Sequence, residues 1–155
     1  MLNIHRIIDA NLNRVKEGLR VCEEITRFIL DDRKLTALFK LYRHQIDTIA
    51  KKVYPVRSPA ARGATSNGVY PASKLLEARR SAEDVGRLNS RLELKRAGLR
   101  DIFWANIQRV KESLRVLEEF SKLKNRKAAL RFKQIRYKVY EIEKKSFKKI
   151  SALPR

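Results

Sequence analysis

The chain has 155 residues, of which 43% are hydrophobic and 35% are charged, and its formal net charge is +20. This length and composition predict one folded domain with a substantial core and favour an amphipathic helical protein over a disordered chain. No apolar run approaches the roughly 20 residues of a membrane-spanning helix, and the N-terminus lacks the apolar segment of a signal peptide. The single cysteine, Cys22, excludes an internal disulfide, so we expect a reducing, cytoplasmic location.

The basic charge is concentrated in residues 120–155, which hold 13 Lys or Arg against two Glu. Such an excess suggests nucleic acid, anionic lipid or phosphorylated ligands as partners. Most of these charges alternate with apolar residues at helical spacing, which favours the solvated face of a packed helix. Nucleic-acid binding therefore stays an alternative that depends on the net charge alone.

Hydrophobic residues recur every three or four positions over four long stretches, which predicts helices at 4–30, 33–53, 91–123 and 126–149. Asp31 and Asp32 end the first helix and can cap the second, while Asn125 ends the third. Ser90 and Glu93 form a capping box at the start of the third helix. No stretch alternates convincingly as a strand would.

The segment between the two helical pairs, residues 54–90, breaks the helical pattern. Residues 54–72 are rich in Pro, Gly, Ser and Ala, one short helix is expected near 74–80, and a second irregular segment follows it. The GATSNG stretch at 63–68 has two glycines, but Val69 and Tyr70 stand where a Walker phosphate loop needs Lys and Ser or Thr. A phosphate loop is therefore excluded, and a crossover of this length in a compact domain is usually functional or disordered.

One phrase occurs twice in the chain, 95 residues apart. Residues 10–24 have the sequence ANLNRVKEGLRVCEE, and residues 105–119 have ANIQRVKESLRVLEE. A second match, after a two-residue slip, relates FKLYRHQI at 39–46 to FKQIRYKV at 132–139. The repeat predicts a single all-α domain, 1–155, in which two antiparallel helical hairpins, about 4–53 and 91–150, pack like a four-helix bundle with pseudo-two-fold symmetry.

Polar residues within the repeat divide into two sets on a helical wheel. Lys16, Arg20 and Glu23 are spaced like an ion-pair ladder on a helix surface. Asn11 and Arg14 instead interrupt an apolar arc, and a buried polar pair must find partners. Their second copies are Asn106 and Arg109. Two such helices side by side would bring both Asn–Arg pairs towards one site, where Arg binds phosphate and Asn binds the edge of a heterocycle.

Three segments carry a resemblance to a known family: RIIDANLNRVKEGLRVCEEITRFILDD at 6–32 with Arg43–His44, EDVGR at 83–87, and the second phrase at 105–119. Together they resemble the small all-helical hydroxymethylpyrimidine phosphate kinases of thiamin biosynthesis. The same module occurs as an N-terminal extension of some long thiamine-phosphate synthases. The resemblance implies transfer of the γ-phosphoryl group from ATP, with Mg²⁺, to 4-amino-5-hydroxymethyl-2-methylpyrimidine phosphate.

The resemblance also implies roles for individual residues. Those that would hold phosphates are Arg14, Arg109, Arg43, Arg79 and Arg80. Asn11 and Asn106 would bind the pyrimidine or ribose. The carboxylates that would hold Mg²⁺ or orient the hydroxymethyl group are Glu17, Glu112 and Asp84, with Asp84 as the metal ligand. The family's crossover usually has an acidic residue where this chain has Arg80, and this departure favours the non-catalytic alternative below.

These observations leave three functions open. The first is a kinase of the thiamin pathway, expected as a homodimer. The second is a non-catalytic module that binds thiamin intermediates or partners a separate thiamine-phosphate synthase. The third is a basic helical protein that binds nucleic acid.

Overall fold

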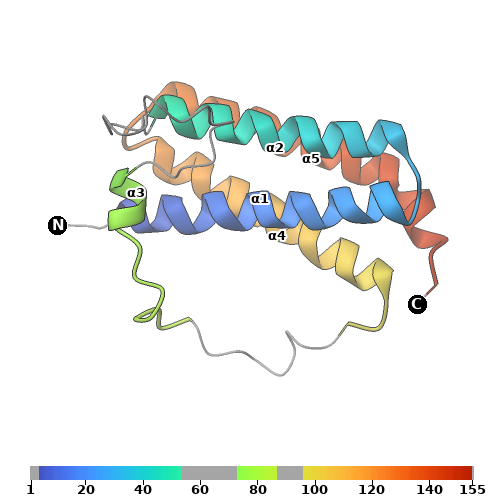
Figure 1. Ribbon diagram of the computed structural model, residues 1–155. Coiled ribbons are helices and arrows are strands. Elements are labelled where there is room, and N and C mark those ends of the chain that lie inside the picture. Colours follow the sequence, from blue (N-terminus) through green and yellow to red (C-terminus); the bar gives the residue numbers. More distant parts are fainter. Residues whose placement is uncertain (1–3, 54–72, 87–95, 155) are drawn as a thin grey trace, which may run out of the picture.

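The computed structural model describes residues 4–53, 73–86 and 96–154 and contains five helices in these ranges (Figure 1). They are α1 (Ile4–Phe28), α2 (Arg33–Val53), α3 (Ser73–Glu77), α4 (Leu99–Ser121) and α5 (Arg126–Ser151). The described parts of the chain contain no strand. The all-α prediction is therefore confirmed.

The first hairpin, α1 and α2, turns within a few residues because two aspartates take different roles. Asp31 has a left-handed backbone, with φ of 47°, a conformation that Asp tolerates better than most residues. The Oδ1 atom of Asp32 accepts a hydrogen bond from the Leu35 backbone N–H at 3.0 Å and so caps α2. Lys149 of α5 donates to the other oxygen of Asp32, and this contact, first among the causes, lowers the pKa of that carboxyl group.

The second hairpin, α4 and α5, starts later than its spacing predicts. Residues 96–98 are not helical, so the predicted helix over 91–123 is wrong at its start, and Ser90 and Glu93 lie outside the described residues. The backbone is extended at Gly98, and Asp101 accepts from the Ala97 N–H at 3.0 Å, which lets α4 begin at Leu99. Asn125 caps α5 by accepting from Ala128 N–H at 3.0 Å.

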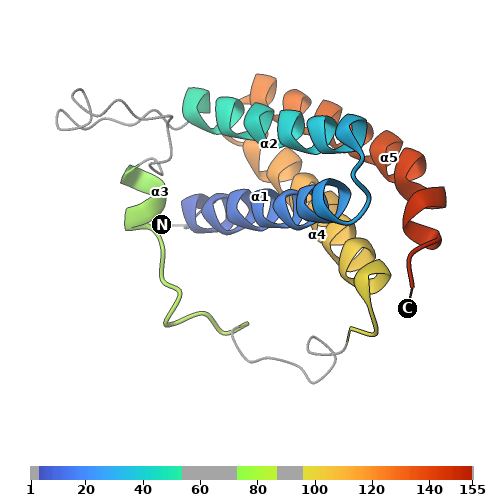
Figure 2. The same ribbon diagram turned by 45° about the vertical axis from the view of Figure 1, so that its right-hand side comes forward.

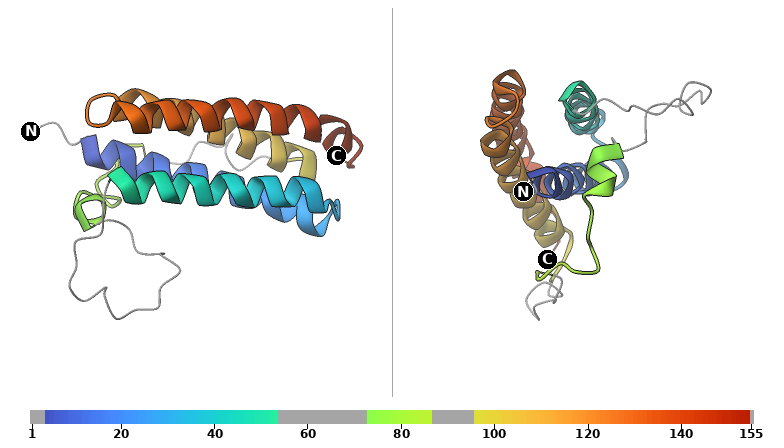
Figure 3. Two further views of the ribbon diagram at one scale, coloured as in Figure 1. Left: turned by 90° about the horizontal axis from the view of Figure 1, so that it is seen from above. Right: turned by 90° about the vertical axis from the view of Figure 1, so that its left-hand side faces the viewer.

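The four long helices form two layers. In Figures 1 and 3, α2 and α5 lie side by side on one side of the α1–α4 pair. Each outer helix packs on its own hairpin partner and also contacts the other outer helix. In Figure 2, α4 runs obliquely across α1. The short helix α3 packs against α1 through Leu75, which is buried. The opposite side of the α1–α4 pair carries neither α2 nor α5.

The α1–α4 pair is the most extensive helix contact among the described residues, and Gly18 lets the two helices approach closely. A Cβ atom at Gly18 would lie 2.7 Å from Cγ2 of Val110 and 3.0 Å from the carbonyl oxygen of Asn106. Further along, Cys22 Sγ lies 3.9 Å from the carbonyl oxygen of Phe103. The partner number on α4 falls as the number on α1 rises, so the two helices are antiparallel.

The core between the layers is continuous and apolar. Its fully buried members come from all four long helices and include Val15, Phe39, Leu114 and Val139. Cys22 is one of them, and burial raises the pKa of its thiol well above the ordinary value, so it stays protonated. None of the helices in the described ranges has both the length and the apolar character to cross a membrane.

We predict that Gly18→Ala destabilises the protein by about 1–3 kcal/mol, because the new methyl group overpacks the α1–α4 contact. Urea unfolding monitored by circular dichroism measures the change. Ser113 is the residue at the same place in the second copy and is buried, so Ser113→Ala is the matched control and should cost less. Equal stability of Gly18→Ala and the wild type would contradict this close approach.

Candidate functional site

Two buried carboxylates join the layers at equivalent places in the two hairpins. Glu23 of α1 accepts from Arg43 Nε of α2 at 3.2 Å, and Arg20 Nη1 lies 3.4 Å from its other oxygen. In the second hairpin, Glu118 of α4 takes the place of Glu23, with Arg136 of α5 and Arg115 as its partners. Glu23 and Glu118 are only 2% and 4% exposed. The predicted ion-pair role of Glu23 and Arg20 is therefore confirmed, with Glu23 also bridging two helices.

The pair in the second hairpin is the more tightly held. Arg136 donates to one oxygen of Glu118 from both Nε and Nη2, at 3.1 and 2.8 Å, and its Nη1 donates to the Tyr140 hydroxyl at 2.8 Å. Burial alone would lower the pKa of Arg136, but the hydrogen bonds with Glu118 and Tyr140 outweigh it and raise that pKa. Arg136 is therefore a permanently charged structural residue.

Arg14 and Arg109 lie on the side of the α1–α4 pair that faces away from α2 and α5. Arg14 precedes Glu23 by nine residues, which is two and a half turns of helix, and therefore points the opposite way. Arg109 stands in the same relation to Glu118. Both arginines are exposed, and neither has an ion pair or hydrogen bond with another described residue. We call this side of the α1–α4 pair the open face.

The two arginines are also level with each other along the helix contact. Gly18 of α1 lies opposite Asn106 of α4. Because the helices are antiparallel, going back four residues on α1 to Arg14 corresponds to going forward four residues on α4 to residue 110. Arg14 is thus level with the neighbour of Arg109. Each half of the repeat supplies one unpaired guanidinium to the same part of the open face, which is an arrangement suited to phosphate groups.

The two asparagines make identical local contacts. The Nδ2 atom of Asn11 donates to the Ile7 carbonyl, and that of Asn106 donates to the Ile102 carbonyl, each at 2.8 Å. Their backbones are not level. Asn106 lies opposite Gly18, and Asn11 is seven residues, or about 10 Å, further along α1. A role for both asparagines in one site stays a prediction, and such a site would have to extend over that distance.

The crossover is fixed to the N-terminal half of α1 by a bidentate ion pair. Arg79 donates to both oxygens of Asp9, from Nε at 2.8 Å and from Nη2 at 2.9 Å. Asp9 is buried. The hydrogen bond with Asp9 is the largest influence on the pKa of Arg79 and raises it, and the charge of Glu17 adds to the effect. The exposed carboxylate of Glu17 therefore lies within electrostatic range of Arg79.

Beyond Arg79 the crossover makes weaker, exposed contacts. Arg6 donates to the carbonyl oxygen of Arg80 at 3.1 Å and lies 3.9 Å from Asp84. The side chain of Arg80 pairs with Glu83 at 3.6 Å. Together these contacts place three predicted residues of the crossover at the N-terminal end of α1: Arg79, Arg80 and Asp84. The described residues contain no cluster of three or more His, Cys, Asp or Glu that could hold a metal ion.

Two predicted residues already have protein partners elsewhere. Arg43 is held by Glu23 on the side of α1 opposite Arg14, so the structure does not bring Arg43 to the open face. Glu112 accepts from Gln108 at 2.8 Å on its own helix.

Among the residues not singled out from the sequence, Asp9 and Arg136 matter most. Arg136 repeats Arg43 in the second match, which was a usable signal, whereas nothing marked Asp9 as buried.

The described elements thus define an all-helical, internally duplicated domain with one unpaired arginine from each half on its open face. The ThiD2 family model matches residues 6–145, and the chain therefore belongs to that family. It is 36% identical to a thiamine-phosphate synthase of Nostoc sp. and 37% identical to one of Synechocystis sp., over 141 residues in each case. A thiamine-phosphate synthase of Rhodopirellula baltica is 33% identical over 136 residues.

The matched region is nearly all of this chain but a minor part of those relatives. It covers 90% of this chain and 34% of the Nostoc protein, and 87% and 32% for the Rhodopirellula protein. The chain thus spans about a third of the length of the curated relatives that it matches. No solved structure is similar to it at a significant level.

We predict that Glu118→Gln destabilises the protein more than Glu23→Gln does. Removing the charge of Glu118 leaves the buried guanidinium of Arg136 without its counter-ion, which costs about 3 kcal/mol. Arg43, the partner of Glu23, is more exposed and makes one longer hydrogen bond, so roughly 1–2 kcal/mol is expected there. Denaturant unfolding of both variants provides the comparison. Equal costs, or the reverse order, would refute the assignment of Glu118–Arg136 as the stronger pair.

We predict that Asp9→Asn releases the crossover, because a neutral side chain no longer holds the Arg79 guanidinium by charge. Hydrogen–deuterium exchange should become faster in residues 73–86 and stay unchanged in the α4–α5 hairpin. Arg80→Ala is the control, since the ion-pair partner of Arg80 among the described residues, Glu83, is exposed, and the Arg80 backbone carbonyl, which Arg6 binds, is retained. Unchanged exchange in Asp9→Asn would show that other contacts hold this segment.

Proposed function

We propose that this protein is a kinase of thiamin biosynthesis that transfers the γ-phosphoryl group of ATP to hydroxymethylpyrimidine monophosphate. The observation that carries the proposal is the pair Arg14 and Arg109, unpaired and level with each other on the open face of a ThiD2-family domain. The names of the thiamine-phosphate synthases that share the matched region support the pathway, because a synthase of that kind would consume the diphosphate product.

The chemistry requires little from the protein beyond positioning and positive charge. An oxygen of the substrate phosphate forms a bond to the γ-phosphorus of ATP, the bond to the β–γ bridging oxygen breaks, and ADP leaves with that electron pair. A phosphate monoester has its second pKa near 6 and is therefore largely deprotonated at neutral pH. The attacking oxygen needs no strong general base, so Glu17 and Glu112 need not serve as one.

Arg14 and Arg109 would bind the phosphates that meet during transfer and offset their negative charge. Because one guanidinium comes from each half of the repeat, the site is complete within one chain, and the dimer expected from the sequence is not needed for it. Arg79 would act indirectly: with Asp9 it keeps Arg80 and Asp84 beside the N-terminal half of α1.

The residues that could bind Mg²⁺ are exposed carboxylates. Mg²⁺ is usually bound by one or two carboxylates together with substrate phosphates and water. Asp84 is exposed, and among the described residues its partners are Arg6, at 3.9 Å, and the backbone N–H of Gly86, so it could serve as such a ligand. Glu17 is the second exposed candidate. The metal would neutralise charge on the β- and γ-phosphates once nucleotide is bound.

A non-catalytic role is the second candidate, and one observation favours it. Arg43 and Arg79, two of the five arginines expected to hold phosphates, are already engaged by Glu23 and Asp9. A module with fewer free cations would bind the pyrimidine phosphate and deliver it to a separate synthase. Binding of the pyrimidine monophosphate without formation of diphosphate in the presence of ATP and Mg²⁺ would select this role.

We predict that the purified protein converts ATP and hydroxymethylpyrimidine monophosphate to ADP and the diphosphate when Mg²⁺ is present. Arg14→Ala and Arg109→Ala should each lower kcat/KM by roughly 10- to 100-fold, since each removes a charged hydrogen-bond donor from a phosphate. Arg131→Ala removes an equal charge from an exposed position on α5 and should change the rate less than about twofold. Product is measured by ³¹P NMR.

Two results would count against this proposal. Absence of diphosphate over a range of metals and temperatures would reject the kinase. Turnover that Arg14→Ala and Arg109→Ala reduce no more than Arg131→Ala would keep the kinase but remove the open face as its site.

A further inference from the structure

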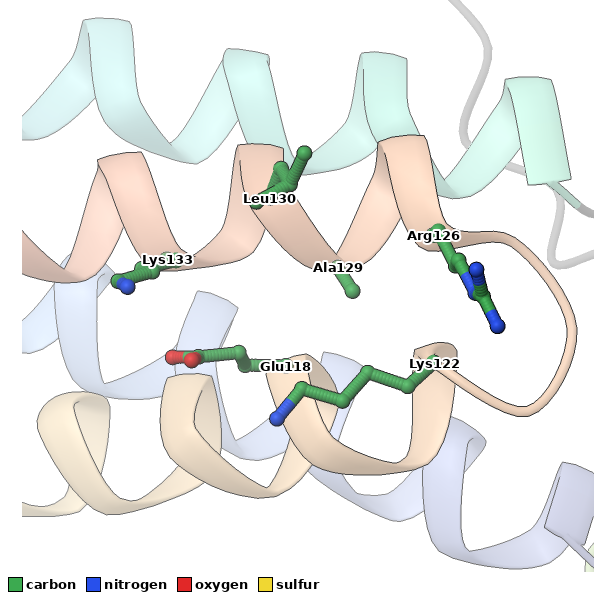
Figure 4. A pocket seen from close by; sticks show the side chains of 6 residues that line it. All are labelled: Glu118, Lys122, Arg126, Ala129, Leu130 and Lys133. Atoms are coloured by element: carbon green, nitrogen blue, oxygen red, sulfur yellow. The ribbon is translucent and has the colours of Figure 1, made fainter.

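A pocket lies between the end of α4 and the start of α5 (Figure 4). Its volume of about 480 Å³ is within the range of small-molecule sites. It is lined by Glu118, Lys122, Arg126, Ala129, Leu130 and Lys133. Since Glu118 points away from Arg109 across α4, this α4–α5 pocket is separate from the open face.

The pocket corresponds to a difference between the two halves of the repeat. In the first hairpin the hydroxyl groups of Thr26 and Thr36 are hydrogen-bonded at 3.2 Å across the helix contact. The second hairpin has Ser121 and Ala129 at these places. Ser121 is 1% exposed, and its hydroxyl has no hydrogen-bond partner among the residues that the structure describes. The second hairpin thus has the smaller side chain, Ala129, where the first has Thr36, and Ala129 is part of the pocket wall.

The charges around the pocket favour an anion. Figure 4 shows Lys122, Arg126 and Lys133 arranged around Ala129. Lys122 is paired with Glu119, whereas Arg126 and Lys133 have no ion pair with any residue in the described ranges. The one carboxylate in the wall, Glu118, is already neutralised by two arginines.

The first hairpin differs in charge as well as in shape. Its turn carries Asp31 and Asp32 where the second hairpin has Lys124 and Asn125. The counterparts of Arg126 and Lys133 are Arg33 and Lys40. A potential that attracts anions is therefore expected at the second turn and is reduced at the first by two acidic residues.

We propose that the α4–α5 pocket binds a small phosphorylated molecule, with its phosphate or diphosphate group between Arg126 and Lys133. Ala129 and Leu130 would contact the uncharged part of the ligand. Arg126 contributes a planar fork that suits phosphate oxygens, and Lys133 a point charge. This site does not depend on the proposed kinase activity and is occupied independently of the open face.

The probe is inorganic pyrophosphate, titrated into the full-length ¹⁵N-labelled protein and monitored by NMR. The amide signals of Ala129, Leu130 and their neighbours should shift with a saturable dependence on concentration. Arg126→Ala and Lys133→Ala should each weaken this binding about tenfold, as expected for loss of a charged hydrogen bond. Arg33→Ala and Lys40→Ala, their counterparts in the first hairpin, remove the same charge and should weaken it less than about twofold.

Ala129→Thr tests the shape of the pocket without a change of charge. The side chain that the first hairpin uses at this place should fill the space, and the saturable shifts at Leu130 should be lost. The proposal is overturned if pyrophosphate causes no saturable shift there. It is also overturned if the Arg33 and Lys40 variants weaken binding as much as the Arg126 and Lys133 variants do, because binding would then reflect the overall +20 charge.

Discussion

The close contact between α1 and α4 determines how every other element is placed. It depends on Gly18, where no Cβ could fit without displacing Val110 or the Asn106 backbone. Because the two helices carry copies of one phrase and run antiparallel, residues at equivalent places lie on the same side of the pair. The outer helices α2 and α5 then cover one side, and the other side is the open face (Figure 1).

This arrangement gives the polar residues of the repeat two different roles. Glu23 and Glu118 point into the covered side, where each is paired with an arginine of the outer helix. Arg14 and Arg109 each lie two and a half helical turns before that glutamate and therefore point to the open face. The same phrase therefore supplies a structural residue and a candidate binding residue. The halves differ in their turns and helix contacts: position 36 is Thr and position 129 is Ala, and Ala129 lines the pocket between α4 and α5.

The sequence alone predicted the helices well, because their apolar spacing, and caps such as Asp32 and Asn125, act over a few residues. The prediction failed at the start of α4. The periodic pattern placed that start at residue 91, but the backbone is extended at Gly98, Asp101 accepts a hydrogen bond from the Ala97 N–H, and the helix begins at Leu99. Repetition directed attention to Arg14 and Arg109, whose binding role stays a prediction, but it could not separate the two sides of the helix pair. That separation depends on α2 and α5. The pairing of Asp9 with Arg79, 70 residues apart, is likewise a tertiary contact without a local signal.

The central claim is that both halves of the repeat build one site. Calorimetric titration of the pyrimidine monophosphate into the wild type, Arg14→Ala, Arg109→Ala and the double variant tests it most directly. One composite site predicts one ligand on the open face, with either single substitution removing much of its affinity and the double substitution costing less than the sum of the two. Any ligand bound in the α4–α5 pocket should be unaffected by these substitutions. Two ligands per chain, each lost with only one of the substitutions, would contradict the claim.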